Sequence, residues 1–168
     1  MKPLALLPAI VLAGCGYHVA GTTNLLPQSI HTIAVPAFAN GSTNFRLANT
    51  LSESVTRELI TRTRYRIVAD PREADAVLYG SVINVFSGPT VSDPGTGRST
   101  GAQIDVQVQA RLLDKTGKVL FDRPNIAFRE RYEISVDPRQ YFDESPAAIQ
   151  RLSRDVARTI VSAILEAF

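Results

Sequence analysis

Apolar and polar residues alternate strictly over residues 104–112, which is the clearest periodic pattern in the chain. Successive side chains of a β-strand point to opposite faces of a sheet, so this pattern predicts a strand with one buried face and one wet face. The positions expected to be buried are Ile104, Val106, Val108, Ala110 and Leu112. The positions expected to be wet are Asp105, Gln107, Gln109 and Arg111.

A second strand is expected to return beside this one. Residues 114–117, Asp-Lys-Thr-Gly, are typical of a hairpin turn, and an apolar run begins again at Val119. Pro124 should disturb the returning strand, because proline has no backbone N–H to donate. The alternation then resumes to residue 134 and places three charged residues beside the wet face of the first strand. These residues are Arg129, Arg131 and Glu133.

The N-terminal half predicts further strands. Residues 30–38 form a β-branched run, and Pro36 indicates that this first strand or its end lies near a sheet edge. Residues 74–86 are apolar on both faces, which predicts a central strand. Residues 65–68 form a short extended segment of uncertain type. Residues 88–101 are rich in Gly, Ser, Thr and Pro, and we expect a mobile loop there.

Two amphipathic helices are predicted. The first has N-cap candidates within residues 40–44 and an apolar face at helical spacing over residues 47–59, a helix of about five turns. Ser145 and Pro146 are a typical cap and first position for the second helix. Its apolar face consists of Ile149, Leu152, Val156, Ile160 and Ile164.

The element order is therefore β-α-β-β-β-α. We expect an α+β protein, a two-layer α/β sandwich in which a mixed four-stranded sheet carries both helices on one face. The helices should cover the dry face that includes Ile104, Val106 and Val108.

The N-terminus has the pattern of an export signal. Lys2 precedes an apolar run over residues 3–13, which is shorter than the ~20 residues that span a bilayer. Residues 12–15, Leu-Ala-Gly-Cys, resemble the lipobox of bacterial lipoproteins, which implies removal of residues 1–14 and attachment of lipid to Cys15. Residues 15–29 would then be a lipidated tether and residues 30–168 one domain. The alternative is an ordinary leader near a buried structural cysteine.

Several lipid chains would anchor the protein firmly, since each buried methylene adds about 0.8 kcal/mol. Gly16 stands where an aspartate marks inner-membrane retention in enteric bacteria, so by analogy we expect the outer membrane, on its periplasmic side.

Composition and charge exclude several classes of function. The formal net charge is +2 over 168 residues, which does not steer a protein towards nucleic acid, and we expect no nucleic-acid partner. A single cysteine allows no intramolecular disulfide. His18 and His31 have no carboxylate at a motif spacing, and the Gly-rich residues 95–101 lack the Gly-Lys-Ser/Thr ending of a phosphate-binding loop. We therefore expect no enzyme activity, no metal site and no cofactor.

Candidate binding residues lie on the wet sheet face and in the adjoining loops. Arginine pairs well with phosphate oxygens, so Arg98, Lys115 and Lys118, which lie in loops at strand ends, could contact phosphate groups. The alternative is a solvent-facing sheet with solvated charges. A hydrophilic exterior would also suit the polar interior of a large outer-membrane barrel.

A family resemblance extends over essentially the whole mature chain. Its segments are residues 15–18 (Cys-Gly-Tyr-His), 33–40 (Ile-Ala-Val-Pro-Ala-Phe-Ala-Asn), the helix over 47–59, and residues 65–68, 74–82 and 113–120. In order and spacing these segments resemble the LPS-assembly lipoprotein family LptE. Residues 74–80 taken alone also resemble the N-terminal domain of TolB-type proteins.

The resemblance implies a lipoprotein that plugs the LptD barrel of the outer membrane, assists assembly of that barrel and binds lipopolysaccharide during its insertion into the outer leaflet. It points to Arg98 and to Arg129 or Arg131 for lipopolysaccharide contact. The alternative is a lipid-anchored periplasmic scaffold of another envelope machine, such as a Tol-like or secretion complex.

Overall fold

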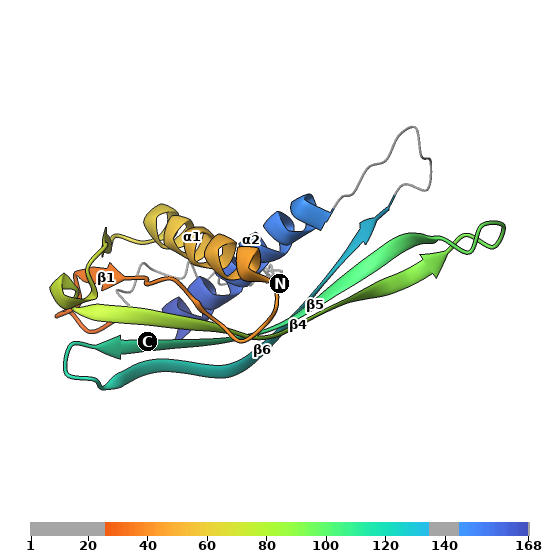
Figure 1. Ribbon diagram of the computed structural model, residues 1–168. Coiled ribbons are helices and arrows are strands. Elements are labelled where there is room, and N and C mark those ends of the chain that lie inside the picture. The colour runs from red at the N-terminus through yellow and green to blue at the C-terminus, as the bar shows by residue number, and fades with distance from the viewer. Residues whose placement is uncertain (1–25, 135–144, 168) are drawn as a thin grey trace, which may run out of the picture.

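The computed structural model describes residues 26–134 and 145–167, and these form two layers. One layer is a mixed sheet, and the other consists of helices α1 (Phe45–Arg62) and α2 (Ser145–Glu166), which lie over the same face of the sheet (Figure 1). The predicted α+β sandwich is confirmed. The sheet of the described chain has six strands where four were expected. They are β1 (Thr32–Ala34), β2 (Ala39–Asn40), β3 (Arg66–Val68), β4 (Ala76–Ser92), β5 (Ser99–Asp114) and β6 (Val119–Glu133).

The sheet order is β3-β1-β4-β5-β6, with β2 also paired to β4. β1 lies parallel to β3 and β4, and β2 is parallel to β4, whereas β4, β5 and β6 form an antiparallel ladder. The two extra strands come from the N-terminal half. The single strand expected over residues 30–38 is wrong, because Pro36 lies in an interruption between β1 and β2. The short segment at residues 65–68 forms β3.

The β4–β5 hairpin is much longer than the sequence indicates. The loop expected over residues 88–101 is wrong, because β4 continues to Ser92 and β5 begins at Ser99. Cross-strand pairing, with register shifts near Pro89 and Val91, keeps this Gly- and Pro-rich stretch extended. The turn is held by Asp93, whose Oδ1 accepts hydrogen bonds from the backbone N–H groups of Gly95 and Thr96. The hairpin therefore projects beyond the helices (Figure 1).

The core lies between the helices and the inner face of the ladder. The even-numbered residues of β5 from Ile104 to Leu112 are buried, as the alternation predicted, and Ala102 is buried as well. The helices contribute apolar residues at helical spacing, and Leu26 and Ile30, which precede β1, also pack into the core. The residues of α1 that are at most 3% exposed are Leu47, Ala48, Leu51, Val55 and Leu59. In α2, Leu152, Val156, Ile160 and Ile164 are likewise at most 2% exposed.

A side-chain cap marks the start of α1, and a β-bulge interrupts β6. Asn44 caps α1, because its Oδ1 accepts a hydrogen bond from the N–H of Leu47 at 3.2 Å. In β6, the predicted disturbance at Pro124 is a register shift: Val108 pairs with Ile126, but Ala110 pairs with Arg123. This β-bulge places one more residue on β6 than on β5, and the strands alternate regularly on both sides of it.

We expect Val106→Asp to unfold the domain or to lower its free energy of unfolding by more than about 4 kcal/mol, because it places an unpaired carboxylate in the core. Val106 is 1% exposed beneath the helices. Gln107→Asp is the matched control, since the Gln107 side chain is exposed on the outer face. Urea denaturation followed by circular dichroism measures both variants, and equal midpoints would contradict this account of the core.

A close contact at Gly80 generates a second stability prediction. A Cβ atom at this position would lie 2.3 Å from ring carbons of Phe38, which is itself only 5% exposed. Gly80→Ala should therefore lower the free energy of unfolding by about 1–3 kcal/mol, because the ring must shift within a packed core. In Gly95→Ala the new Cβ meets only Asp93 Oδ1 at 3.4 Å, so this control should unfold within about 0.5 kcal/mol of the wild type. Thermal denaturation of the two variants tests the contact.

Candidate functional site

The outer face of β5 and β6, on the side away from the helices, carries a connected group of polar side chains. The register pairs Asp105 with Arg129 and Gln103 with Arg131. Arg129 Nε donates to Asp105 Oδ1 at 2.7 Å, and Arg131 Nε donates to Gln103 Oε1 at 3.3 Å. Gln103 Nε2 in turn donates to Asp105 Oδ2 at 2.7 Å. We call these four residues, Gln103, Asp105, Arg129 and Arg131, the arginine network.

Asp105 is the only carboxylate of this network, and both of its oxygens accept hydrogen bonds. The guanidinium of Arg129, and after it the amide of Gln103, hold the pKa of the Asp105 carboxyl below its ordinary value. Asp105 is therefore ionised at neutral pH and neutralises Arg129. The pair remains open to solvent, because the Arg129 side chain is 64% exposed and that of Asp105 is 32% exposed.

A second ion pair lies on the same face, beyond the β6 bulge. Arg111 and Asp122 are opposite each other in the register, and Arg111 Nη2 lies 3.0 Å from Asp122 Oδ2. Gln107, between the two pairs, is exposed. The face predicted from the alternation is thus confirmed as polar, and acidic residues of the neighbouring strand compensate two of its arginines, Arg111 and Arg129.

The loop cations lie far apart along β5. Arg98 ends the turn before β5, whereas Lys115 and Lys118 lie in the turn that follows Asp114. The 16 residues of β5 separate these turns by about 50 Å. Arg98, Lys115 and Lys118 form no ion pair with any residue that the structure describes. A single small anion can therefore not contact all five candidate cations. Arg129 and Arg131 are the two that lie on the same face of one strand.

Two residues of the outer face were not foreseen as partners. Gln103 directly precedes the alternation that begins at Ile104, in the short stretch between the expected loop and the expected strand. Asp122 precedes the bulge at Pro124, so no strand pattern marked its face. Extending the alternation of residues 104–112 backwards by one residue places Gln103 on the wet face.

The β4 part of the outer face is apolar and exposed. Tyr79 is 49% exposed, Ile83 42% and Phe86 64%. β4 is the central strand of the sheet, as its apolarity on both faces predicted, but helices cover only its inner side (Figure 1). Sequence alone did not reveal this exposure, since an apolar residue normally indicates burial. Phe86 pairs with Asp105 in the register, so the apolar strip adjoins the arginine network.

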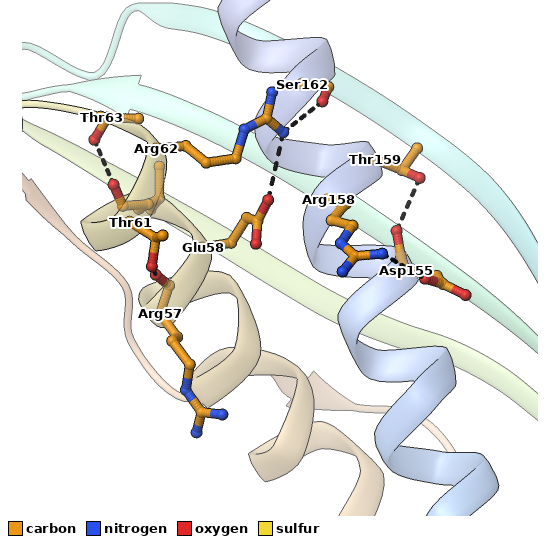
Figure 2. Close-up of polar contacts among 10 residues, drawn as sticks. Arg57, Glu58, Thr61, Arg62, Thr63, Asp155, Arg158, Thr159 and Ser162 are labelled. Atoms are coloured by element: carbon orange, nitrogen blue, oxygen red, sulfur yellow. Dashed lines mark hydrogen bonds and ion pairs between the residues drawn. The ribbon is translucent and has the colours of Figure 1, made fainter.

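Other polar contacts hold the helices in place. Figure 2 shows Arg62 of α1 donating from Nη1 to Ser162 Oγ of α2 at 2.7 Å and lying 3.4 Å from Glu58 Oε1. On the inner side of β6, Arg151 of α2 forms a 2.6 Å ion pair with Glu130. These arginines serve the packing of the helix layer, and they lie apart from the outer face.

Cys15, the expected lipidation site, and His18 lie outside the described residues. His31 is described, and its backbone N–H donates to Asp75 Oδ2 at 3.0 Å. Within residues 26–134 and 145–167, no group of three His, Cys, Asp or Glu side chains is placed to hold a metal ion. None of the helices in this part of the chain has the length and apolarity needed to cross a bilayer.

Comparison with known proteins identifies the family. The model of the lipopolysaccharide-assembly family LptE matches residues 30–164, which include every strand and nearly all of α2. The chain belongs to the LptE family. The predicted resemblance is thus confirmed, and the protein is a lipopolysaccharide-assembly lipoprotein of the cell envelope. A search of curated protein sequences gives no match.

Solved structures share the fold of this LptE-family chain at low sequence identity. Lipoprotein B from Nitrosomonas europaea has a TM-score of 0.55 and 16% identity, covering 82% of this chain and 88% of that one. Rare lipoprotein B from Shewanella oneidensis has a TM-score of 0.52 and 18% identity, covering 77% and 93%. PelC from Paraburkholderia phytofirmans, solved as a dodecamer, has a TM-score of 0.53 and 15% identity, covering 82% and 90%.

Proposed function

We propose that this LptE-family protein is the plug of an outer-membrane lipopolysaccharide translocon. It sits inside an LptD-like β-barrel, assists the assembly of that barrel and binds lipopolysaccharide on its way to the outer leaflet. Lipid on Cys15 holds it to the periplasmic side of the outer membrane. Its role is binding and assembly, without catalysis, a cofactor or a metal.

The polar outer face of β5 and β6 carries the proposal. The lumen of a large outer-membrane barrel is lined by polar residues and water, so a plug needs a hydrophilic exterior. The cross-strand pairs Arg129–Asp105 and Arg111–Asp122 provide charged groups without a large net charge on this face. The exposed sides of both helices are also polar at most positions, with Arg57, Arg154 and Arg158 among the exposed residues. Such a surface fits a wet enclosure better than contact with acyl chains.

Lipopolysaccharide carries phosphate groups, and Arg129 and Arg131 are the best-placed pair to bind one. They are two residues apart on β6, on the same face, and both are exposed. Two guanidinium groups at this spacing can share the oxygens of one phosphate. Arg98 lies in the turn at the tip of the β4–β5 hairpin, nearer to this pair than Lys115 and Lys118 are. We assign Lys115 and Lys118 to a separate contact at the opposite end of β5.

The partner test is extraction in mild detergent followed by pull-down of the full chain. We expect to recover a large, heat-modifiable barrel protein, and mass spectrometry of the same sample should find Cys15 acylated. Recovery of soluble periplasmic proteins alone would contradict the plug. Depletion that leaves surface lipopolysaccharide normal would favour the rival function, a periplasmic scaffold of another envelope machine.

We expect the double variant Arg129→Glu, Arg131→Glu to weaken lipopolysaccharide binding at least about tenfold, because it replaces two phosphate donors with repelling charges. Its melting temperature should fall little, since exposed ion pairs contribute little to stability. Arg57→Glu with Arg154→Glu makes the same change of charge on the exposed side of the helices and serves as the control. Equal binding by both double variants, measured by fluorescence anisotropy, would remove Arg129 and Arg131 from the site.

A further inference from the structure

The arginines best placed for phosphate already have an anionic partner within the fold. Asp105 lies opposite Arg129 in the register and accepts its Nε hydrogen bond at 2.7 Å. Arg131 reaches the same carboxylate through Gln103, whose amide accepts from Arg131 and donates to Asp105. One carboxylate therefore organises both arginines.

The loop cations differ in this respect. Arg98, Lys115 and Lys118 form no ion pair within the described ranges; Lys115 and Lys118 interact electrostatically with Asp75 and Asp114 without pairing with them. At the arginine network, an incoming phosphate must take the position that Asp105 holds, or share Arg129 with it. A carboxylate left beside a bound phosphate would repel it.

We propose that Asp105 is a displaceable internal counter-ion, which the phosphate of bound lipopolysaccharide replaces at Arg129 and Arg131. This inference rests on the proposed function. Asp105 holds the two guanidinium groups in one orientation while the site is empty and weakens the binding of phosphate by competing for the same donors. A transport protein must release its cargo, and a competing carboxylate at the site speeds release without any conformational change.

The physical balance favours this exchange. An exposed ion pair in water is weak, so an anion of higher charge displaces the carboxylate readily. A phosphate group has three oxygens and about twice the charge of a carboxylate, so it gains more from two neighbouring guanidinium groups than Asp105 does. Because Asp105 is 32% exposed, its carboxylate can turn into water when it leaves Arg129.

The test compares Asp105→Asn with Asp122→Asn, using rough lipopolysaccharide and the same preparation after dephosphorylation as probes. Both variants remove one negative charge from the same face, and each breaks one ion pair of similar exposure. We expect Asp105→Asn to bind the phosphorylated probe about three- to tenfold more tightly, a factor typical of an exposed ion pair. Asp122→Asn should stay within about twofold of the wild type, and the dephosphorylated probe should not distinguish the variants. Stopped-flow measurements should show that lipopolysaccharide dissociates faster from the wild type than from Asp105→Asn.

Two outcomes would overturn the counter-ion. One is unchanged or weaker binding by Asp105→Asn, while Arg129→Glu with Arg131→Glu still abolishes binding; the binding site would then stand without the counter-ion. The other is equal tightening by Asp105→Asn and Asp122→Asn, which would indicate a general charge effect. If the arginine double variant binds normally, the proposed site itself fails. Asp105→Ser provides a second variant without the carboxylate should Asp105→Asn fold poorly.

Discussion

Helices α1 and α2 bury one face of the β4–β5–β6 ladder, and the arrangement of the polar residues follows from that one-sided burial. The inner residues of β5 are at most 4% exposed, so a slip of one residue in register would place Asp105 and Arg111 beneath the helices. Burial of each large apolar side chain stabilises the fold by about 1.5–3 kcal/mol, so the register is strongly determined. Because side chains alternate between the two faces of a strand, the residues between the buried ones of β5 and β6 lie on the outer face.

The outer face is consequently built from cross-strand pairs. Directly opposed residues of an antiparallel ladder have neighbouring side chains, and here Asp105 faces Arg129 and Asp122 faces Arg111. These pairs add little to stability because they are exposed. Their effect is on the character of the surface, which is rich in charged groups yet nearly neutral. That combination suits the proposed role, in which the protein stays hydrophilic inside a polar barrel and binds an anionic lipid reversibly.

The outer face of the sheet has two kinds of surface, one polar and one apolar. β5 and β6 bear the arginine network, whereas β4 exposes Tyr79, Ile83 and Phe86 beside it. The polar contacts of the helix layer, Arg62 with Glu58 and Ser162, and Arg151 with Glu130, hold the opposite side of the sandwich together. Arginines in this protein thus have two distinct uses. Arg62 and Arg151 join structural elements, whereas Arg129 and Arg131 lie open on the surface.

The sequence by itself determined the two helices, the buried face of β5, the N-cap of α1 and the disturbance at Pro124, because these depend on local periodicity and on the chemistry of single residues. It also carried the resemblance to the LptE family. It predicted a loop where the long β4–β5 hairpin forms, because pairing between strands overrides the preference of Gly, Ser and Pro for loops. Only the tertiary structure decided that β4 is exposed on its outer face, that Pro36 separates two strands, and that Asp105 neutralises Arg129. Each of these depends on which segments lie side by side, and residues 24 positions apart, such as Asp105 and Arg129, become neighbours only when the ladder forms.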